Sequence, residues 1–109
     1  MEDYPIELFG LEIRKGWLPL VEPIIDRVQE LKEAGSDVKI LQIKEKWGAL
    51  RIYSLNAPDE LLQLVHNAEE KSMRICEECG GPATQVHVNG WIYTRCSDCI
   101  EKLRRRRKI

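Results

Sequence analysis

With 109 residues, the chain is long enough for one domain plus a small appended module. Its hydrophobic fraction of 43% is typical of a folded protein, and no apolar run approaches the length of a transmembrane helix, which argues against an integral membrane protein. The formal net charge of −1 argues against a nucleic-acid binder that depends on overall basicity.

The first fifteen residues carry apolar side chains without a clear period. Leu11 and Ile13 alternate with Glu12 and Arg14, as side chains do on the two faces of a strand. This segment is therefore expected to be either a short strand or an irregular piece that packs on the core.

Residues 17–34 have the pattern of a first helix. Apolar side chains recur at helical spacing and define one face for the core: Trp17, Leu20, Val21, Ile24, Ile25, Val28 and Leu31. Pro19 suits a first helical turn, whereas Pro23 predicts either a later start or a bend. Gly35 is expected to end the helix, because glycine readily adopts the left-handed conformation found there.

Residues 38–46 and 49–55 are rich in strand formers and predict a β-hairpin, with Trp47-Gly48 at its turn and Gly48 at positive φ. Alternate residues of a strand share a face, so Lys44 and Lys46 point the same way, and Arg51 is expected to join them across the ladder. Together with Trp47 and Tyr53, these residues form a candidate surface for phosphate or a carboxylate-rich protein. The alternative is an ordinary solvated outer face.

Residues 56–73 predict a second helix. Asn56 is a candidate N-cap, and Pro58 suits the first turn. Its apolar face comprises Leu61, Leu62, Leu64, Val65 and Ala68. His66 lies four residues before Glu70, which predicts a pair on the helix surface and not a catalytic base.

The only four cysteines form two C-x-x-C pairs, Cys76 with Cys79 and Cys96 with Cys99, separated by sixteen residues. This spacing is typical of a zinc site and atypical of a redox motif. Each pair brings two sulfurs together from one tight turn, and Gly80 can adopt the positive φ that directs backbone N–H groups towards the sulfurs. The sequence therefore predicts one structural Zn²⁺ bound by all four cysteines.

The segment between the pairs predicts another hairpin, with strands at 83–88 and 91–95 and Asn89-Gly90 as the two-residue turn. Two cysteine turns joined by a hairpin describe a zinc ribbon, in which Glu77 and Glu78 are expected to be solvated. Because this segment has few large apolar residues, we expect its folding to depend on the metal.

Other uses of the cysteines fit less well. Two disulfides are possible, but the acidic start Met1-Glu2-Asp3-Tyr4 does not resemble a signal peptide, which favours a reducing cytoplasm. A thioredoxin-like pair needs only one C-x-x-C, in a βαβ setting. A catalytic zinc needs an open coordination position, and four cysteines leave none. The His-x-Glu and Pro-Cys-x-x-Cys pattern of zinc deaminases does not occur.

Residues 100–109 form a dense basic tail that can continue a short helix after the second cysteine pair. Its charged residues are Lys102, Arg104, Arg105, Arg106, Arg107 and Lys108. Such a tail is an electrostatic arm for nucleic acid or an acidic surface, a nuclear address if the source is eukaryotic, or simply a solubilising end.

Charge is divided unevenly along the chain. Residues 1–70 carry 8 basic and 14 acidic side chains, or −6, and residues 71–109 carry 9 and 4, or +5. Four thiolates on one Zn²⁺ add −2 and leave about +3 in the second part. The predicted fold is α+β: a helix–hairpin–helix body over 1–73 and a zinc ribbon with a basic tail over 74–109, packed as one unit.

The stretch from Gln42 to Tyr53 resembles a group of small, uncharacterised bacterial and phage proteins that share K-E-K-[aromatic]-G-x-L-R-x-Y, an intervening helix and then C-E-x-C-G. Gly16-Trp17 also fits, so the resemblance covers most of the chain from Gly16 to Cys99. It implies no particular activity. Residues 76–99 also resemble zinc ribbons in general, including those of transcription and translation machinery, which serve many roles.

The sequence favours a non-catalytic adaptor that contacts nucleic acid or a nucleic-acid-handling protein, with Trp47, Trp91 or Tyr93 available for stacking. The candidate contact residues are Lys44, Lys46, Trp47, Arg51, Tyr53, Arg95, Arg104, Arg105, Arg106, Arg107 and Lys108. The alternative is an inhibitor, antitoxin or immunity protein of phage or plasmid type that acts through protein contacts. An enzyme is not favoured, because no nucleophile–base pair, phosphate loop or pair of carboxylates is present.

Overall fold

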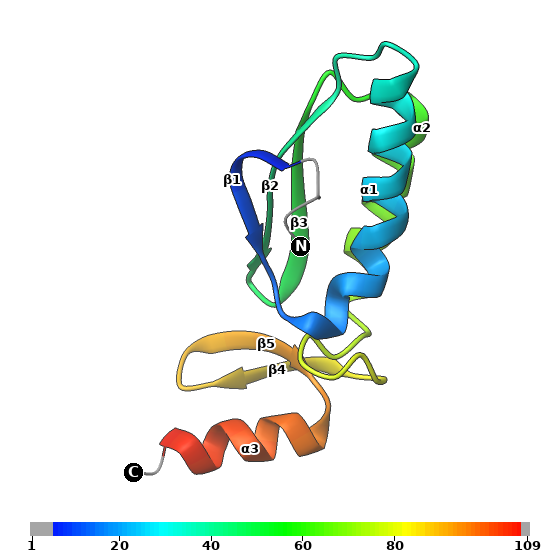
Figure 1. Ribbon diagram of the computed structural model, residues 1–109. Coiled ribbons are helices and arrows are strands. Elements are labelled where there is room, and N and C mark those ends of the chain that lie inside the picture. The colour runs from blue at the N-terminus through cyan, green and yellow to red at the C-terminus, as the bar shows by residue number, and fades with distance from the viewer. Residues whose placement is uncertain (1–5, 108–109) are drawn as a thin grey trace.

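The computed structural model describes residues 6–107, which form a three-stranded sheet, a two-stranded sheet and three α-helices (Figure 1). The larger sheet contains β1 (Ile6–Glu12), β2 (Lys39–Lys46) and β3 (Ala49–Leu55), in that order. β1 pairs with β2 in parallel, and β2 pairs with β3 in antiparallel. α1 (Leu18–Glu33) connects the two parallel strands, and α2 (Asp59–Ser72) follows β3.

The mixed α+β class and the helix–hairpin–helix order agree with the sequence, and β1 completes the body. The first segment was expected to be either a strand or irregular, and residues 6–12 form a parallel edge strand. β1, α1 and β2 therefore make a β-α-β unit, which places both helices against one face of the sheet (Figure 1). The other face, called the outer sheet face below, is not covered by these helices.

The core lies between the sheet and the two helices. Its buried members come from the short 3-10 helix that precedes α1 (Lys15–Trp17), one face of α1, the β2–β3 hairpin with the residue before it, and one face of α2: Trp17, Val21, Ile24, Ile25, Val28, Val38, Ile40, Ile43, Leu50, Ile52, Leu61, Val65 and Ala68. The apolar side chains that recur at helical spacing and those that alternate along the strands thus pack together in one layer. α1 runs through the exposed Pro23 without ending, and Gly35 closes it at φ +97°.

α2 also covers the edge of β3. The backbone N–H of Leu50 donates to Ser72 Oγ at 2.9 Å, and that of Ile52 donates to Glu69 Oε2 at 3.0 Å. These two side chains satisfy donors that an edge strand would otherwise offer to another chain. α2 is therefore attached to the sheet by polar contacts as well as by its apolar face.

Asn56 does not cap α2, contrary to the prediction. It adopts φ +58°, and its side chain donates to the carboxylate of Asp37 at 3.2 Å, across the end of the β2–β3 hairpin. Pro58 occupies the N-cap position and makes no side-chain cap bond. Asparagine tolerates the left-handed conformation, and here that property serves the connection between β3 and α2.

Residues 74–107, called the C-terminal unit below, contain the smaller sheet and the third helix. β4 (Thr84–Val88) and β5 (Trp91–Arg95) form the predicted hairpin, and α3 (Ser97–Arg107) follows directly. Asn89 and Gly90 both have positive φ, as the two-residue turn requires. In Figure 1, α3 lies on the side of the β4–β5 hairpin opposite to the body. No helix within residues 6–107 is long and apolar enough to span a membrane.

Among residues 6–107, the C-terminal unit contacts the body around Gly16 and around the turn of the β2–β3 hairpin. At the first, the Gly16 N–H donates to Glu77 O at 2.9 Å, and the Trp17 indole N–H donates to Ile75 O at 2.8 Å. At the second, the turn of the β2–β3 hairpin lies on β5, where Thr94 Oγ1 donates to Gly48 O. Backbone groups and buried side chains thus connect the two parts of the chain.

Candidate metal centre and binding surface

The four cysteine sulfurs lie within 4.8 Å of one another and can hold a metal ion. Cys76 and Cys79 come from the turn before β4, whereas Cys96 directly precedes α3 and Cys99 lies in its first turn. All four are free thiols, and Cys79 Sγ lies 3.7 Å from Cys96 Sγ. A tetrahedral ion with sulfur ligands at about 2.3 Å separates its sulfurs by about 3.8 Å, so this spacing fits such an ion.

Backbone hydrogen bonds shape the first cysteine turn. The Cys76 N–H donates to Gly81 O at 2.7 Å, and the Gly80 N–H donates to Cys76 O at 2.9 Å. Gly80 has φ +85°, as its position after the C-x-x-C pair predicted. The turn therefore presents both of its sulfurs to the second cysteine pair.

The thiols differ in how readily they ionise. Burial alone would raise the pKa of Cys76, but hydrogen bonds from the backbone N–H groups of Cys79, Cys96 and Glu78 lower it to about 7. Burial and the neighbouring sulfurs raise the pKa of Cys99 to about 12. Four sulfurs this close cannot all be thiolates unless a cation compensates their charge, which is what a bound metal ion supplies.

Glu77 is buried, so the prediction that it is solvated is wrong. Its side chain is 5% exposed, and its Oε1 lies 3.6 Å from the Arg95 guanidinium. Its Oε2 accepts a hydrogen bond from the Thr94 N–H at 3.2 Å. Burial raises the pKa of Glu77, although the charge of Arg95 and the Thr94 N–H oppose that change. Glu78 is partly exposed and lies 3.7 Å from Arg95 and 3.5 Å from Arg14.

Arg95 was a candidate contact residue, but it belongs to the interior of the C-terminal unit. Its side chain is 5% exposed and carries the ion pairs with Glu77 and Glu78. Its guanidinium lies 4.8 Å from the centre of the Tyr93 ring, within the range of a cation–π contact. Sequence alone places an arginine at the end of a strand but does not show that two glutamates cover it.

The outer sheet face brings several of the predicted contact residues together. Lys44 pairs directly with Arg51 across β2 and β3, which confirms the expected register. Lys46 and Tyr53 lie on the same face by strand alternation. Glu12 of β1 lies beside Lys44 and accepts a hydrogen bond from Gln42 at 2.8 Å, so the face also carries one carboxylate.

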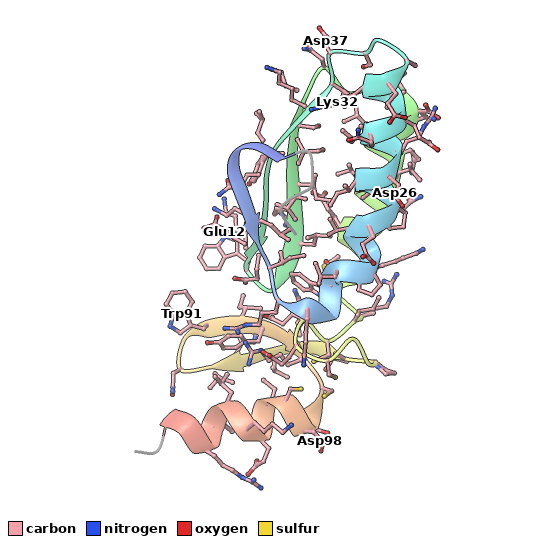
Figure 2. All side chains as sticks on the ribbon, in the orientation of Figure 1. Glu12, Asp26, Lys32, Asp37, Trp91 and Asp98 are labelled. Carbon is pink, nitrogen blue, oxygen red and sulfur yellow. The ribbon has the colours of Figure 1, made fainter. Side chains whose placement is uncertain are left out.

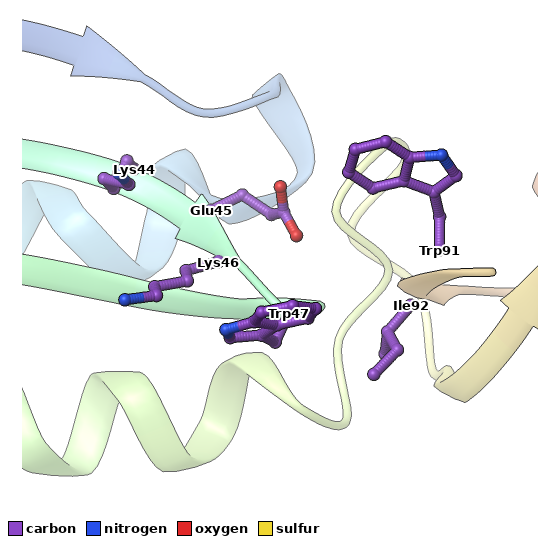
Figure 3. Close-up of a pocket in the computed structure, with 6 residues that line it drawn as sticks. All are labelled: Lys44, Glu45, Lys46, Trp47, Trp91 and Ile92. Atoms are coloured by element: carbon purple, nitrogen blue, oxygen red, sulfur yellow. The ribbon is translucent and has the colours of Figure 1, made fainter.

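A groove that sequence reasoning missed lies where the body meets the C-terminal unit. It is lined by Lys44, Glu45, Lys46, Trp47, Trp91 and Ile92 and has a volume of about 230 Å³. Trp47 is 65% exposed and Trp91 is 61% exposed. In Figure 3 the two indoles lie on different sides of the groove, with the Glu45 carboxylate between them. Figure 2 shows Trp91 and Glu12 on the same side of the molecule, away from Asp26 of α1. The available signal was a tryptophan at the turn of each hairpin.

The basic tail is part of α3 and not a separate arm over the described residues. Arg104 and Arg105 are exposed, and Arg105 Nε lies 3.5 Å from Glu101. Arg106 and Arg107 continue the helix, and Lys108 lies outside the described residues. In Figure 1 the C-terminal end of α3 points to the side of the molecule away from α1 and α2, the side of the outer sheet face.

Replacing Gly16 by alanine is expected to weaken metal binding. The added Cβ would lie 2.2 Å from Cys76 O and 2.6 Å from Glu77 C, both backbone atoms of the first cysteine turn. Because neither atom can move unless that turn shifts, we expect a loss of stability of about 1–3 kcal/mol. Competition with a colorimetric chelator measures the accompanying change in metal affinity.

Gly35→Ala is the matched control for this variant. A Cβ there would have no atom within 4 Å, and the cost is confined to the strain of a positive φ, about 1–2 kcal/mol. Its metal affinity should equal that of the unmodified chain. Equal metal affinities for Gly16→Ala and Gly35→Ala would show that the contact at Gly16 does not support the site.

Comparison of the chain with protein-family models, with curated proteins and with solved structures finds no match. The cysteine cluster and the outer sheet face must therefore be interpreted from their own residues.

Proposed function

We propose that this chain is a small, non-catalytic zinc protein that contacts nucleic acid through its outer sheet face. The observation that carries this proposal is the cross-strand pair Lys44–Arg51 on the face that the helices leave uncovered. The exposed aromatic residues Trp47 and Tyr53 belong to the same hairpin. Positive charge beside exposed aromatic rings suits the phosphates and bases of a nucleic acid.

The metal proposed for the four cysteines is one Zn²⁺ with a structural role. A set of four sulfurs is typical of Zn²⁺ or an iron–sulfur centre. The distance of 3.7 Å between Cys79 Sγ and Cys96 Sγ suits two ligands of a single ion. Four protein ligands leave no open position, which supports the absence of metal catalysis. The first pair lies in a turn, as in a zinc ribbon, whereas the second pair lies at the start of α3 and not in a second turn.

A cytoplasmic location is part of this proposal, because a reducing compartment keeps four cysteines available to the metal. We also propose that the chain belongs with the small bacterial and phage proteins that share its Lys44-to-Tyr53 stretch and its cysteine spacing. The body over 1–73 and the metal-binding unit over 74–109 would act together, since Gly16 and Gly48 of the body contact the C-terminal unit.

Salt dependence of binding tests the proposed function. A protein that neutralises phosphates loses affinity as salt rises, and each lost phosphate contact flattens the log–log slope by about 0.7–0.9. Lys44→Ala combined with Arg51→Ala should therefore weaken binding and reduce the slope by about 1.4–1.8. Fluorescence anisotropy with labelled single- and double-stranded oligonucleotides measures both quantities.

Lys71→Ala combined with Arg74→Ala is the matched control, because it removes the same two charges from exposed positions outside the outer sheet face. Its affinity and salt slope should stay close to those of the unmodified chain. If neither single- nor double-stranded oligonucleotides are retained at 50 mM salt, the nucleic-acid proposal fails.

A second candidate is a protein inhibitor, antitoxin or immunity protein. It is favoured by the exposure of Leu62 and Leu64 on α2, at 47% and 40%, together with the acidic charge of residues 1–70. Affinity purification from the native host, with and without nuclease, separates the two candidates. A stoichiometric partner that resists nuclease and is lost in Leu62→Asp would support the protein contact.

A further inference from the structure

The groove between the two hairpins contains two exposed tryptophans, only one of which belongs to the hairpin that forms the outer sheet face. Two large indoles, those of Trp47 and Trp91, remain mostly in solvent although an apolar residue, Ile92, lies beside them. Burying such rings would stabilise the fold, so their exposure indicates a binding role. The groove is concave and lies next to the Lys44–Arg51 pair.

We propose that this groove holds one base of a single-stranded nucleic acid between the indoles of Trp47 and Trp91. The inference rests on the proposed nucleic-acid function and narrows it to single strands. Every base has a flat π-face that stacks on an aromatic side chain. Bases of a duplex are already stacked on their neighbours, so a duplex cannot supply one to the groove without local unstacking.

Charge complementarity supports this occupant. Lys44 and Lys46 line the groove, and Arg51 continues the positive charge along the outer sheet face. Phosphates on either side of the held base can follow these residues. Arg104 and Arg105 of α3 are exposed on the other side of the β4–β5 hairpin and add positive charge to the same unit.

Glu45 gives the groove a preference among bases. Its Oε2 accepts a hydrogen bond from the Gly48 N–H at 2.8 Å, and no hydrogen bond to Oε1 occurs within the described part of the chain. The carboxylate can accept a hydrogen bond from an exocyclic amino group, as glutamate does with cytosine N4. It repels phosphates and the carbonyl edges of thymine and uracil, so bases with an amino group are favoured.

The two walls of the groove are held by direct contact between the hairpins. Gly48 lies so close to β5 that a Cβ would meet Ile92 Cγ2 at 2.8 Å. Gln85 Nε2 donates to Trp47 O at 3.4 Å, and Thr94 Oγ1 donates to Gly48 O. The backbone on both sides of the groove is therefore held in place before a ligand binds. The wall that contains Trp91 belongs to the C-terminal unit, which the cysteine site stabilises.

Binding of labelled dC12, dT12 and a 12-base-pair duplex by the zinc-loaded full chain tests the proposal, with RNA versions of the single strands alongside. We expect both single strands to bind more tightly than the duplex, dC12 several-fold more tightly than dT12, and tryptophan fluorescence to be quenched. Trp47→Ala and Trp91→Ala should each weaken single-strand binding by roughly tenfold or more, and Trp91→Phe should restore most of it. Glu45→Gln retains an acceptor for Gly48 but can offer an N–H to the groove, so the preference for dC12 should fall or reverse.

Met73→Ala, at the C-terminal end of α2, is the control for an exposed large side chain outside the groove, and it should bind as the unmodified chain does. Zinc content and far-UV circular dichroism show that each variant is folded. If folded Trp47→Ala and Trp91→Ala bind dC12 with unchanged affinity while Lys44→Ala with Arg51→Ala weakens it, the base site is wrong and the proposed function stands. Equal affinity for duplex and single strands would overturn the base site in the same way. If none of the probes binds at 50 mM salt, the proposed nucleic-acid function itself is disproved.

Discussion

Removal of the metal ion should unfold the C-terminal unit and leave the body folded. The buried core cluster draws its residues from positions 17–68, and Ile75 is the only described side chain of the C-terminal unit that packs against it. Within the described C-terminal unit, the buried apolar side chains other than the cysteines are Val88 and Ile100. So small a core cannot offset the entropy of ordering a hairpin and a helix. Structural Zn²⁺ supplies about 10–16 kcal/mol of apparent binding free energy in small zinc modules.

Two-dimensional NMR during titration with a chelator measures this result. Amide signals of β4 and β5 should collapse towards random-coil positions, whereas those of Ile43 and Val65 in the body should keep their dispersion. The indole N–H of Trp17 reports on the junction, because it donates to Ile75 O at 2.8 Å. It should shift when the C-terminal unit unfolds, even though Trp17 itself stays in the core.

Variants extend the same test without a chelator. Cys99→Ser should reproduce the metal-free spectrum, because it removes one of four ligands from a buried position. Ser97→Ala is the control, since Ser97 is exposed and lies between the cysteines of the second pair. A protein that contains no metal by elemental analysis and still shows the β4–β5 signals would disprove the structural role of the ion.

The features predicted correctly from sequence are the local ones. Both hairpins follow from the residues of their turns, because the pairs Trp47-Gly48 and Asn89-Gly90 adopt the positive φ angles that two-residue turns require. The helices follow from the spacing of apolar residues such as Val21, Ile25 and Val28. The convergence of the cysteines follows from their spacing, which brings two short turns to one place.

The features that sequence did not predict depend on residues far apart in the chain. The sequence left β1 open between a strand and an irregular segment, because its partner, β2, lies beyond α1 and parallel pairing leaves no turn signal. Glu77 is buried because Arg95 reaches it from the end of β5. The groove exists because the turn of the β2–β3 hairpin lies on β5, and each hairpin contributes one tryptophan. The Glu77–Arg95 contact leaves no period or motif in the sequence, and the groove leaves only a tryptophan beside each hairpin turn.

Breaking the buried ion pair between Glu77 and Arg95 is expected to cause a large loss of stability. Arg95→Met should destabilise the C-terminal unit by up to about 3–5 kcal/mol, because it leaves the buried Glu77 carboxylate with only the exposed Arg14 guanidinium, 3.8 Å away, as a charged partner. Methionine keeps much of the arginine stem's volume, so the loss reports on charge more than on packing. Thermal unfolding of the zinc-loaded protein, monitored at the hairpin signals, measures the change. Arg27→Met is the control, since Arg27 pairs with Glu30 and Glu60 at the surface and should change stability far less.

The double variant Glu77→Gln with Arg95→Met separates a structural role of Arg95 from a role in binding. A neutral glutamine can still accept the hydrogen bond from the Thr94 N–H, and it needs no charged partner, so most of the lost stability should return. The refolded double variant should then bind nucleic acid as the unmodified chain does, because Arg95 is 5% exposed and faces glutamates. If stability returns while affinity stays low, Arg95 contacts the nucleic acid after all and must leave its ion pairs to do so.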